Sequence, residues 1–255
     1  MTRHLWIGTS WKMNKTRAEA RAFASALSSA PIINDVRIQP FVIPPFTSLA
    51  EVADLLAKTR IRVGAQNMHW ADAGAWTGEI SPLMIKDAGA TLVELGHSER
   101  RTHFGETNAT VSLKVAAALR HGLTPLICIG DTREEFDAKQ TAEVLARQVA
   151  AALAKIAQEQ RTETILFAYE PVWSIGEGGT PAEPGFVNAQ HVLIKALTQR
   201  IMGRPLPVLY GGSVNPGNAR ELAAQFNVDG LFIGRSAWAA EGYVGILEQV
   251  AGAMT

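Results

Sequence analysis

Short apolar segments alternate with longer segments of helical periodicity along the whole chain of 255 residues. Several apolar segments are uninterrupted, such as 165–167 (Ile-Leu-Phe) and 231–233 (Leu-Phe-Ile). A strand that is covered on both faces needs this pattern, as in a parallel sheet. The pattern predicts strands at residues 5–8, 40–43, 61–66, 91–95, 126–129, 164–169, 208–210 and 230–233.

The segments between these strands have the features of amphipathic helices. Thr16 with Glu19, and Ser48 with Glu51, have the spacing of capping boxes, in which side chains satisfy the free amide groups at a helix start. Apolar residues at helical spacing predict buried helix faces. They are Val111, Val115 and Leu119, with Gly122 as the stop signal, and Leu145, Val149, Leu153 and Ile156 within a helix expected at 141–158.

Roughly eight strand-then-helix units follow one another without a linker, a low-complexity stretch or a block of like charges. This alternation is typical of an α/β protein, either a closed (β/α)₈ barrel or an open doubly wound sheet. The number of units favours the barrel, which commonly uses roughly 250 residues as one domain. We therefore expect a single barrel domain over residues 1–255, with the open sheet as the alternative.

Composition narrows the range of partners. Lys and Arg number 24 and Asp and Glu number 24, so the formal net charge is zero and gives no general attraction to nucleic acid or to an anionic membrane. The single cysteine, Cys128, excludes an intrachain disulfide and fits a reducing compartment as a buried apolar side chain. No apolar run approaches the roughly 20 residues that span a bilayer, and the N-terminus lacks a signal-type segment. We expect a cytoplasmic protein that binds neither nucleic acid nor membrane.

Three predicted strands end in polar residues that suit acid–base chemistry. Lys12 follows the first strand, His97 follows the fourth and Glu170 follows the sixth. Chemistry in either architecture belongs at the carboxyl ends of the strands, so in a barrel these side chains converge on one mouth. A carboxylate that takes a proton, an imidazole that polarises an oxygen and an ammonium that stabilises an enolate suit proton abstraction next to a carbonyl.

Glycine-bearing turns near this mouth predict a site for an anion. Gly176 lies in the loop after the sixth strand, Gly211-Gly212-Ser213 follows the seventh, and Gly234-Arg235-Ser236 follows the eighth. Loops after the seventh and eighth strands of such barrels are the usual phosphate site. No group of His, Cys, Asp and Glu has metal-ligand spacing and no G-x-G-x-x-G turn opens a helix, so the sequence predicts no metal and no nucleotide cofactor.

Seven short strings in the chain match a known family. They are WKMN (11–14), AQN (65–67), TGE (77–79), ELGHSERR (94–101), ICIG (127–130), AYEPVW (168–173) and YGGSV (210–214). With these strings at these spacings, the chain resembles triosephosphate isomerase over essentially its whole length. The resemblance implies a single-domain (β/α)₈ TIM barrel. It also implies an isomerase without a cofactor that moves a carbonyl between adjacent carbons of a small phosphorylated sugar through an enediolate.

The resemblance also implies a role for each residue of the site. Glu170 corresponds to the general base, His97 to a neutral electrophile at the start of a helical turn, Lys12 to the cation beside the substrate, and Glu99 to a supporting carboxylate. Residues that correspond to substrate and phosphate contacts are Ser10, Lys12, Gly176, Ser213, Gly234 and Arg235. The segment 171–181 corresponds to a lid that closes over the substrate, and it includes Pro171, Val172, Trp173, Gly179, Thr180 and Pro181.

The same resemblance implies a homodimer. In that family the third loop, here residues 67–79, inserts beside the active site of the partner subunit, and Thr77 lies near its tip. His69 is the other histidine of interest because it lies in this loop.

Four residues depart from the family pattern. Ser10 stands where the family has an Asn that contacts the substrate, Arg235 replaces a glycine, and Gly179 replaces a lysine of the lid. Pro181 lies where a backbone amide normally bonds the tyrosine that corresponds to Tyr210, and proline has no amide hydrogen. With residues 68–70 and 234–238, these departures resemble a branch that acts on erythrulose phosphates in erythritol catabolism.

The leading hypothesis is therefore the conversion of L-erythrulose 1-phosphate to D-erythrulose 4-phosphate. The alternative is ordinary triosephosphate isomerase, which interconverts dihydroxyacetone phosphate and glyceraldehyde 3-phosphate in glycolysis. A third hypothesis, a phosphate sensor without catalysis, has no need to keep Glu170, His97 and Lys12 together.

Overall fold

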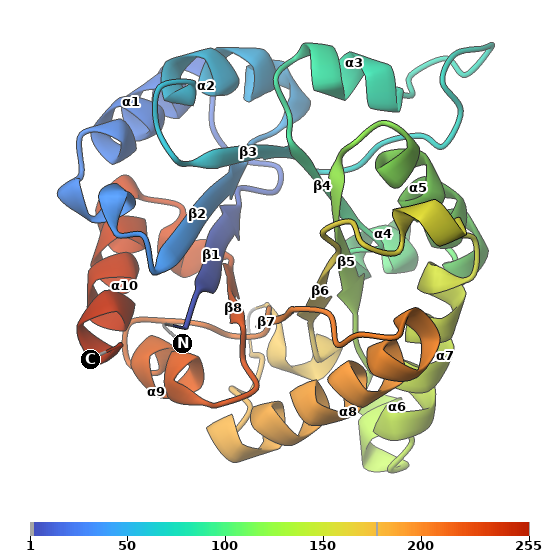
Figure 1. The fold of residues 1–255 in the computed structure, drawn as a ribbon. Helices are drawn as coiled ribbons and strands as arrows, with labels where there is room; N and C mark the ends of the chain where they lie inside the picture. Colours follow the sequence, from blue (N-terminus) through green and yellow to red (C-terminus); the bar gives the residue numbers. More distant parts are fainter. Residues whose placement is uncertain (1–2, 177, 255) are drawn as a thin grey trace.

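The apolar segments form eight parallel strands that close into a barrel in chain order, with the last strand paired to the first (Figure 1). The computed structural model describes residues 3–176 and 178–254. Closure confirms the predicted barrel and excludes the open sheet. The strands are β1 (Leu5–Ser10), β2 (Ile38–Ile43), β3 (Arg62–Ala65), β4 (Leu92–Leu95), β5 (Thr124–Ile129), β6 (Leu166–Tyr169), β7 (Val208–Tyr210) and β8 (Gly230–Ile233).

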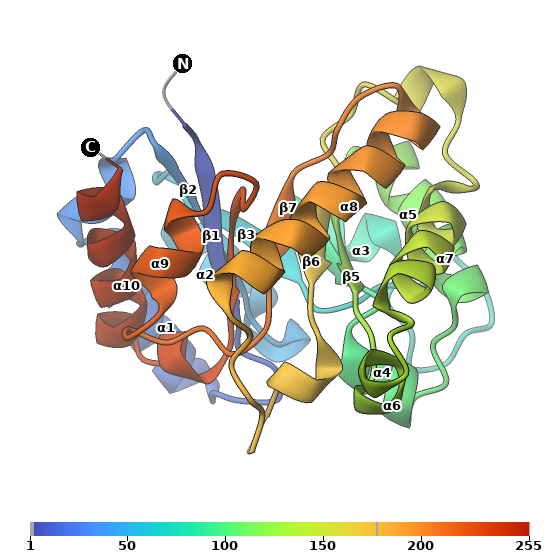
Figure 2. The same ribbon diagram turned by 90° about the horizontal axis from the view of Figure 1, so that it is seen from below.

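Helices surround the barrel as an outer ring, and their apolar faces pack on the strands (Figure 1). The two ends of the barrel differ (Figure 2): the chain enters β1 at one end, and two short helices, α4 and α6, lie at the other. The helices are α1 (Arg17–Ser28), α2 (Leu49–Leu56), α3 (Pro82–Asp87), α4 (Ser98–His103), α5 (Asn108–Arg120), α6 (Arg133–Asp137), α7 (Thr141–Leu153), α8 (Pro184–Met202), α9 (Ala219–Ala224) and α10 (Ala240–Ala253).

Two apolar cores result from the alternation of side chains along each strand. The larger core lies between the strands and the helices, and the smaller one fills the barrel itself. Inside the barrel Gly8 makes room for Phe41, because a Cβ at Gly8 would lie 2.3 Å from the Phe41 ring. Cys128 is buried in the inner core, as predicted. The inner core is made of Phe41, Ile43, Leu92, Leu126, Cys128, Leu166, Ala168, Leu209 and Phe232.

The predicted helix ends are confirmed at some positions and wrong at others. Thr16 and Glu19 form the predicted capping box at α1. The second box, at Ser48, is wrong: Ser48 makes no capping hydrogen bond, because it belongs to the 3-10 turn η2 (Phe46–Ser48) and its backbone is not extended. Glu51 instead bonds arginine side chains of α1. The stop at Gly122 is confirmed, with a φ of 70°.

The predicted helix at 141–158 is too long. Helix α7 ends at Leu153, and Ile156 lies in the turn that follows. Ile156 is nevertheless buried against the same core, which explains why it continued the apolar stripe. The apolar periodicity here identified buried residues but did not give the position of the helix end.

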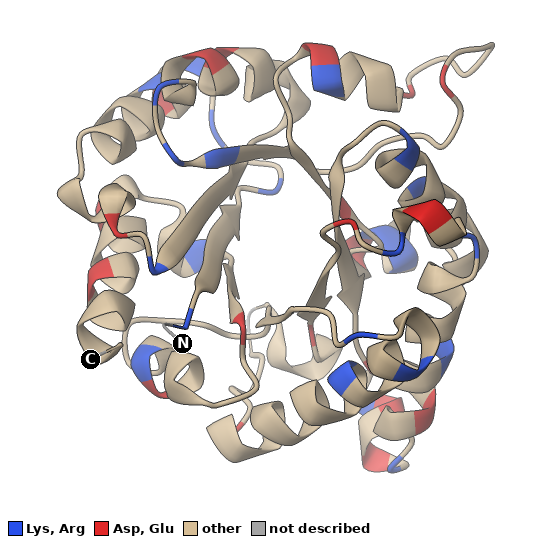
Figure 3. Ribbon diagram, in the orientation of Figure 1, with Lys and Arg blue, Asp and Glu red and all other residues tan. Residues whose placement is uncertain are grey.

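Charges of both signs alternate around the outer ring (Figure 3). Among the described residues, no helix has the length and apolar character needed to cross a membrane. Within residues 3–176 and 178–254, no grouping of His, Cys, Asp and Glu is placed to hold a metal ion.

Candidate active site

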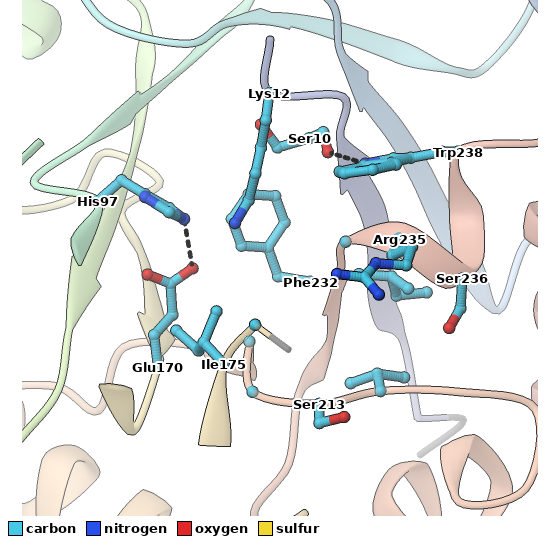
Figure 4. A pocket seen from close by; sticks show the side chains of 16 residues that line it. Ser10, Lys12, His97, Glu170, Ile175, Ser213, Phe232, Arg235, Ser236 and Trp238 are labelled. Carbon is cyan, nitrogen blue, oxygen red and sulfur yellow. Dashed lines mark hydrogen bonds and ion pairs between the residues drawn. The ribbon is translucent and has the colours of Figure 1, made fainter. Parts of the chain in front are cut away.

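A cavity of about 210 Å³ opens where the strands end, and the predicted polar residues surround it (Figure 4). Ser10 ends β1 and Lys12 follows it, His97 follows β4, and Glu170 follows β6. The glycine turns after β6, β7 and β8 complete the wall. The other lining residues are Ile175, Gly176, Gly211, Gly212, Ser213, Val214, Phe232, Ile233, Gly234, Arg235, Ser236 and Trp238.

The carboxyl group of Glu170 is buried at the end of β6. Two glycines allow this position: a Cβ at Gly130 would lie 1.9 Å from the Glu170 carbonyl oxygen, and one at Gly211 would lie 2.7 Å from its Cγ. Burial raises the pKa of Glu170 to about 8, and the charge of Glu94 acts in the same direction. Oε2 of Glu170 has no hydrogen-bond partner in the described protein. The site therefore holds a carboxyl group with a raised pKa and a free oxygen.

His97 caps the N-terminus of α4, and this fixes its tautomer. Its Nδ1 accepts a hydrogen bond of 3.1 Å from the backbone amide of Glu99, so Nε2 carries the ring hydrogen. Burial, together with the charge of Lys12, lowers the pKa of His97 to about 4, so the imidazole is neutral near pH 7. Nε2 lies 3.7 Å from Oε1 of Glu170, which is too long for a hydrogen bond (Figure 4). A neutral donor and a carboxyl group thus face the same space.

Lys12 has a strained backbone at the mouth of the barrel. Its φ is +53°, a conformation that costs a residue other than glycine on the order of 1–3 kcal/mol. Gln66 stabilises it by donating a 2.8 Å hydrogen bond from Nε2 to the Lys12 carbonyl oxygen. The Lys12 ammonium pairs with Oε1 of Glu99 at 2.6 Å. Burial acts to lower the pKa of Lys12, but Glu99 and the other carboxylates outweigh it, so the pKa is raised and the side chain is charged.

Ser10 lies on the cavity wall, only 3% exposed. Its carbonyl oxygen accepts a 3.0 Å hydrogen bond from Nε1 of Trp238, which joins the end of β1 to the loop after β8 (Figure 4). The side chain of serine is shorter than that of asparagine, so the wall leaves more room here than the family pattern does.

The glycine turns keep their backbone open to the cavity. No atom lies within 4 Å of the Cβ that a residue other than glycine would have at Gly176 or Gly234, and the φ of Gly176 is +85°. Arg235 begins a short 3-10 turn, η5 (Arg235–Ala237), and lines the cavity. The amide of Ser213 donates to Oγ of Ser174 at 3.2 Å in this structure. The turns after β6 and β8 therefore present open backbone, while the Ser213 amide is engaged by the lid.

The predicted lid is tied to the barrel at two points. Trp173 lies in η4 (Val172–Ser174) and donates from Nε1 to buried Asp131, which also accepts from the Tyr169 hydroxyl at 3.1 Å. The Ser174 hydroxyl lies 3.1 Å from the Tyr210 hydroxyl. The lid thus rests on Tyr210 of β7 and on Asp131 in the loop after β5.

The departures within the lid have local explanations. At Gly179 a Cβ would lie 2.5 Å from the Ser174 carbonyl oxygen, so the lysine of the family pattern does not fit this conformation. Thr180 donates its amide to the Trp173 carbonyl oxygen at 3.3 Å. Next to Pro181, the amide of Ala182 faces the Tyr210 phenol, and it acts with Ser174 against the rise in the Tyr210 pKa that burial causes. The amide of Ala182 therefore lies near the Tyr210 phenol, next to the position where Pro181 has no amide hydrogen.

Thr77 lies away from this cavity. It is exposed in the loop between β3 and α3, which projects from the ring (Figure 1). In the same loop His69 stacks on Trp70 and contacts Trp76, with ring centroids 4.0 and 4.4 Å from its own, and Trp76 remains 49% exposed.

Sequence reasoning missed Glu94 as a residue of this site. Glu94 lies in β4, its side chain is buried, and its Oε1 is 3.9 Å from Nε2 of His97. The available signal was a single carboxylate within the apolar segment 92–95, in a strand covered on both faces. Asp131, which is buried in the loop after β5, was also not predicted from the sequence.

The fold and the site define a (β/α)₈ barrel protein with a buried carboxyl group, a neutral imidazole and an ammonium around one cavity. The family model described as triosephosphate isomerase matches residues 5–250. The chain belongs to the triosephosphate isomerase family, and it is an isomerase.

Relatives of high similarity carry one name. The chain is 60% identical over 246 residues to the L-erythrulose-1-phosphate isomerase of Brucella abortus biovar 1 (strain 9-941). The aligned residues cover 96% of each chain. It is 59% identical over 249 residues to the protein of that name from Mesorhizobium japonicum, covering 98% of each. The corresponding protein of Rhizobium rhizogenes is 58% identical over 246 residues, which cover 96% of this chain and 94% of the relative.

Proposed function

We propose that this isomerase converts L-erythrulose 1-phosphate to D-erythrulose 4-phosphate. The observation that carries the proposal is the arrangement of Glu170, His97 and Lys12 around one cavity, which is also lined by the short side chain of Ser10. The names of the relatives support the four-carbon substrate. L-erythrulose 1-phosphate is dihydroxyacetone phosphate with one extra hydroxymethyl group on the carbon that loses its proton, so the same base and donor serve both reactions.

Each residue of the cavity has a role in this proposal. Glu170 takes the proton from the hydroxyl-bearing carbon next to the carbonyl and returns it to the carbon that held the carbonyl. Nε2–H of His97 polarises the carbonyl oxygen and stabilises the enediolate. The Lys12 ammonium adds positive charge beside that oxygen, and Glu99 positions it through the 2.6 Å ion pair. The carbonyl thereby moves by one carbon with no net change in oxidation state.

The phosphate group occupies the side of the cavity formed by the glycine turns. Backbone amides of Gly176, Ser213, Gly234 and Arg235 would bind its oxygens, since glycine backbone approaches an anion closely. Binding then requires the Ser213 amide to leave the Ser174 hydroxyl. Closure of the lid, residues 171–181, would exclude water from the enediolate.

The proposal extends to assembly and location. The projecting loop with its exposed Trp76 and Thr77 supports a homodimer in which this loop meets the partner subunit. The single buried Cys128 supports a reducing, cytoplasmic location.

The deciding experiment compares substrates. Purified enzyme should show a higher kcat/KM for L-erythrulose 1-phosphate than for dihydroxyacetone phosphate. The reverse order would reject the four-carbon substrate and support triosephosphate isomerase. A chain that bound inorganic phosphate but turned over neither compound would support the sensor.

A further inference from the structure

Glu94 is a buried carboxyl group that the proposed reaction does not use. It lies on β4, where Leu92, two residues earlier, belongs to the apolar core inside the barrel. Because side chains alternate along a strand, Glu94 points toward the barrel axis as Leu92 does. Its side chain is about 4% exposed, and its Oε2 has no hydrogen-bond partner among the described residues.

An unpartnered carboxyl oxygen in a protein core is costly. Burial of a polar group without a compensating hydrogen bond is unfavourable, and burial of a charged group is more so. Burial accordingly raises the pKa of Glu94 to about 7. A leucine at this position would fill the core without that cost. The carboxyl group therefore calls for a role outside stability.

The neighbours of Glu94 place it directly behind the cavity wall. Its Oε1 is 3.9 Å from Nε2 of His97, and the Ser10 hydroxyl lies beside its carboxyl group, where it acts to lower the Glu94 pKa. His97 and Ser10 both line the cavity (Figure 4). Glu94 thus lies behind the part of the wall where a short side chain leaves room.

The topology of the barrel puts Glu94 on the side away from the phosphate-binding turns. In a closed barrel of eight strands in chain order, β4 lies opposite β8, which leads into Gly234 and Arg235. The phosphate of the substrate is expected at those turns, and the reacting carbons lie near Glu170 and His97. The end of the substrate farthest from the phosphate therefore points toward β4.

We propose that Glu94, reached past Ser10, binds the terminal hydroxyl group of a four-carbon substrate. The inference rests on the proposed function, because the extra hydroxymethyl group distinguishes L-erythrulose 1-phosphate from dihydroxyacetone phosphate at this end. The hydroxyl donates to the free Oε2 of Glu94, and Ser10 provides the space. A hydrogen bond to a carboxylate is short and strong, and it satisfies the oxygen that the protein leaves unpaired.

This arrangement discriminates against the shorter substrate. A three-carbon substrate leaves the carboxyl oxygen buried and unpaired in the complex, whereas the four-carbon one removes that cost. Sites that are built to bind a substrate hydroxyl reject the analogue without it far more strongly than apolar pockets reject a missing methylene. Glu94 is therefore a specificity-determining residue.

The test measures kcat/KM for both substrates in Glu94→Gln, Glu94→Leu and a control, Leu126→Met. Leu126 pairs with Glu94 in the strand register and belongs to the inner core, so its substitution alters the same layer without changing charge. The preference for L-erythrulose 1-phosphate over dihydroxyacetone phosphate should fall roughly 10- to 100-fold in Glu94→Leu. It should fall less in Glu94→Gln, whose amide oxygen still accepts a hydrogen bond, and stay unchanged in Leu126→Met.

Thermal unfolding supplies the second measurement. Because Glu94→Leu removes an unpaired buried carboxyl group, it should keep or raise the midpoint of unfolding while the preference falls. An equal loss of kcat/KM for both substrates, or an unchanged preference in both Glu94 variants, would overturn the proposal. Glu94→Gln carries the test alone if the leucine variant does not fold. A wild-type preference for dihydroxyacetone phosphate is a different result, since it rejects the proposed function itself before any variant is made.

Discussion

The inside of the barrel has two halves that follow the same backbone pattern and carry opposite chemistry. On β4 the inward residues are Leu92 and then Glu94. On β6 the inward residue Leu166 is followed, four residues later and just after the strand ends, by Glu170. One half is filled by apolar side chains, and the half at the carboxyl ends holds buried carboxyl groups with raised pKa values. The strands thus stabilise the barrel at one end and hold costly groups at the other.

The unfavourable burial of carboxyl groups is confined to the carboxyl ends of the strands. Glycines at 8, 130 and 211 let large or charged groups approach the backbone closely, and the apolar half supplies the burial that offsets the unpaired oxygens. Substitutions at the carboxyl ends should therefore lower activity, and substitutions in the apolar half should lower stability.

The largest expected effect is on activity. Glu170→Gln should lower kcat by at least ~10²–10⁴-fold, because the amide cannot take the proton. The fold and the binding of inorganic phosphate should remain, as judged by circular dichroism and calorimetry. Glu163→Gln, which changes an exposed carboxylate before β6, is the matched control and should leave kcat unchanged. Retention of substantial turnover in Glu170→Gln would remove the base from the proposal.

The next effect is on stability. Leu166→Ala empties part of the inner core on the strand that leads to Glu170, and it should cost about 2–5 kcal/mol of unfolding free energy. Denaturant unfolding measures that cost. Under conditions where the variant is folded, its kcat/KM should stay within a few-fold of wild type. A loss of activity as large as that of Glu170→Gln would show that the two halves are not separable.

A smaller effect is expected in the pH dependence of stability. Burial raises the pKa values of Glu94 and Glu170 from 4.5 to about 7 and about 8, so the folded chain binds more protons than the unfolded chain between pH 4.5 and 8. Their stabilising contribution is fully present below pH 4.5 and is lost as the pH rises through 7 and 8. His97 and His191 act in the opposite sense, mainly below pH 7, because their pKa values are lowered from 6.5 to about 4 and about 3.

Between pH 6.5 and 8 the two carboxyl groups outweigh the histidines. The free energy of unfolding should fall there on the order of 1–2 kcal/mol as the pH rises, measured by urea titration at each pH. Glu94→Gln should flatten this slope, both by removing one group and by lowering the pKa of Glu170. Glu248→Gln, at an exposed carboxylate of α10, should leave it unchanged. A slope that is flat in wild type would contradict the burial of charge at this end.

The smallest effect concerns the helix starts. Thr16→Ala removes a capping box that the structure contains and should cost about 1 kcal/mol of unfolding free energy. Ser48→Ala removes a hydroxyl without a hydrogen bond and should change stability by less than about 0.5 kcal/mol. Equal losses in the two variants would mean that Ser48 caps α2 in solution.

Much of the molecule could be predicted from local patterns. Apolar segments identified each of the eight strands, although polar residues interrupt some of them, and the residues at their ends predicted Lys12, His97 and Glu170 at one mouth. Errors arose where a local signal had two readings. Ser48 and Glu51 have capping spacing, yet a 3-10 turn occupies the position, and Ile156 continues an apolar stripe beyond the end of its helix. Spacing along the chain cannot tell a buried turn from a helix.

The sequence by itself determined the order of strands and helices and the residue types at each strand end, because side-chain periodicity and turn chemistry act over a few residues. Only the tertiary structure decided that Glu94 lies beside Ser10 and on the strand opposite β8, that the Ser213 amide meets Ser174, and that Ala182 faces Tyr210 beside Pro181. These contacts join segments that lie far apart along the chain. Their distances depend on barrel closure and strand register, which no local pattern contains.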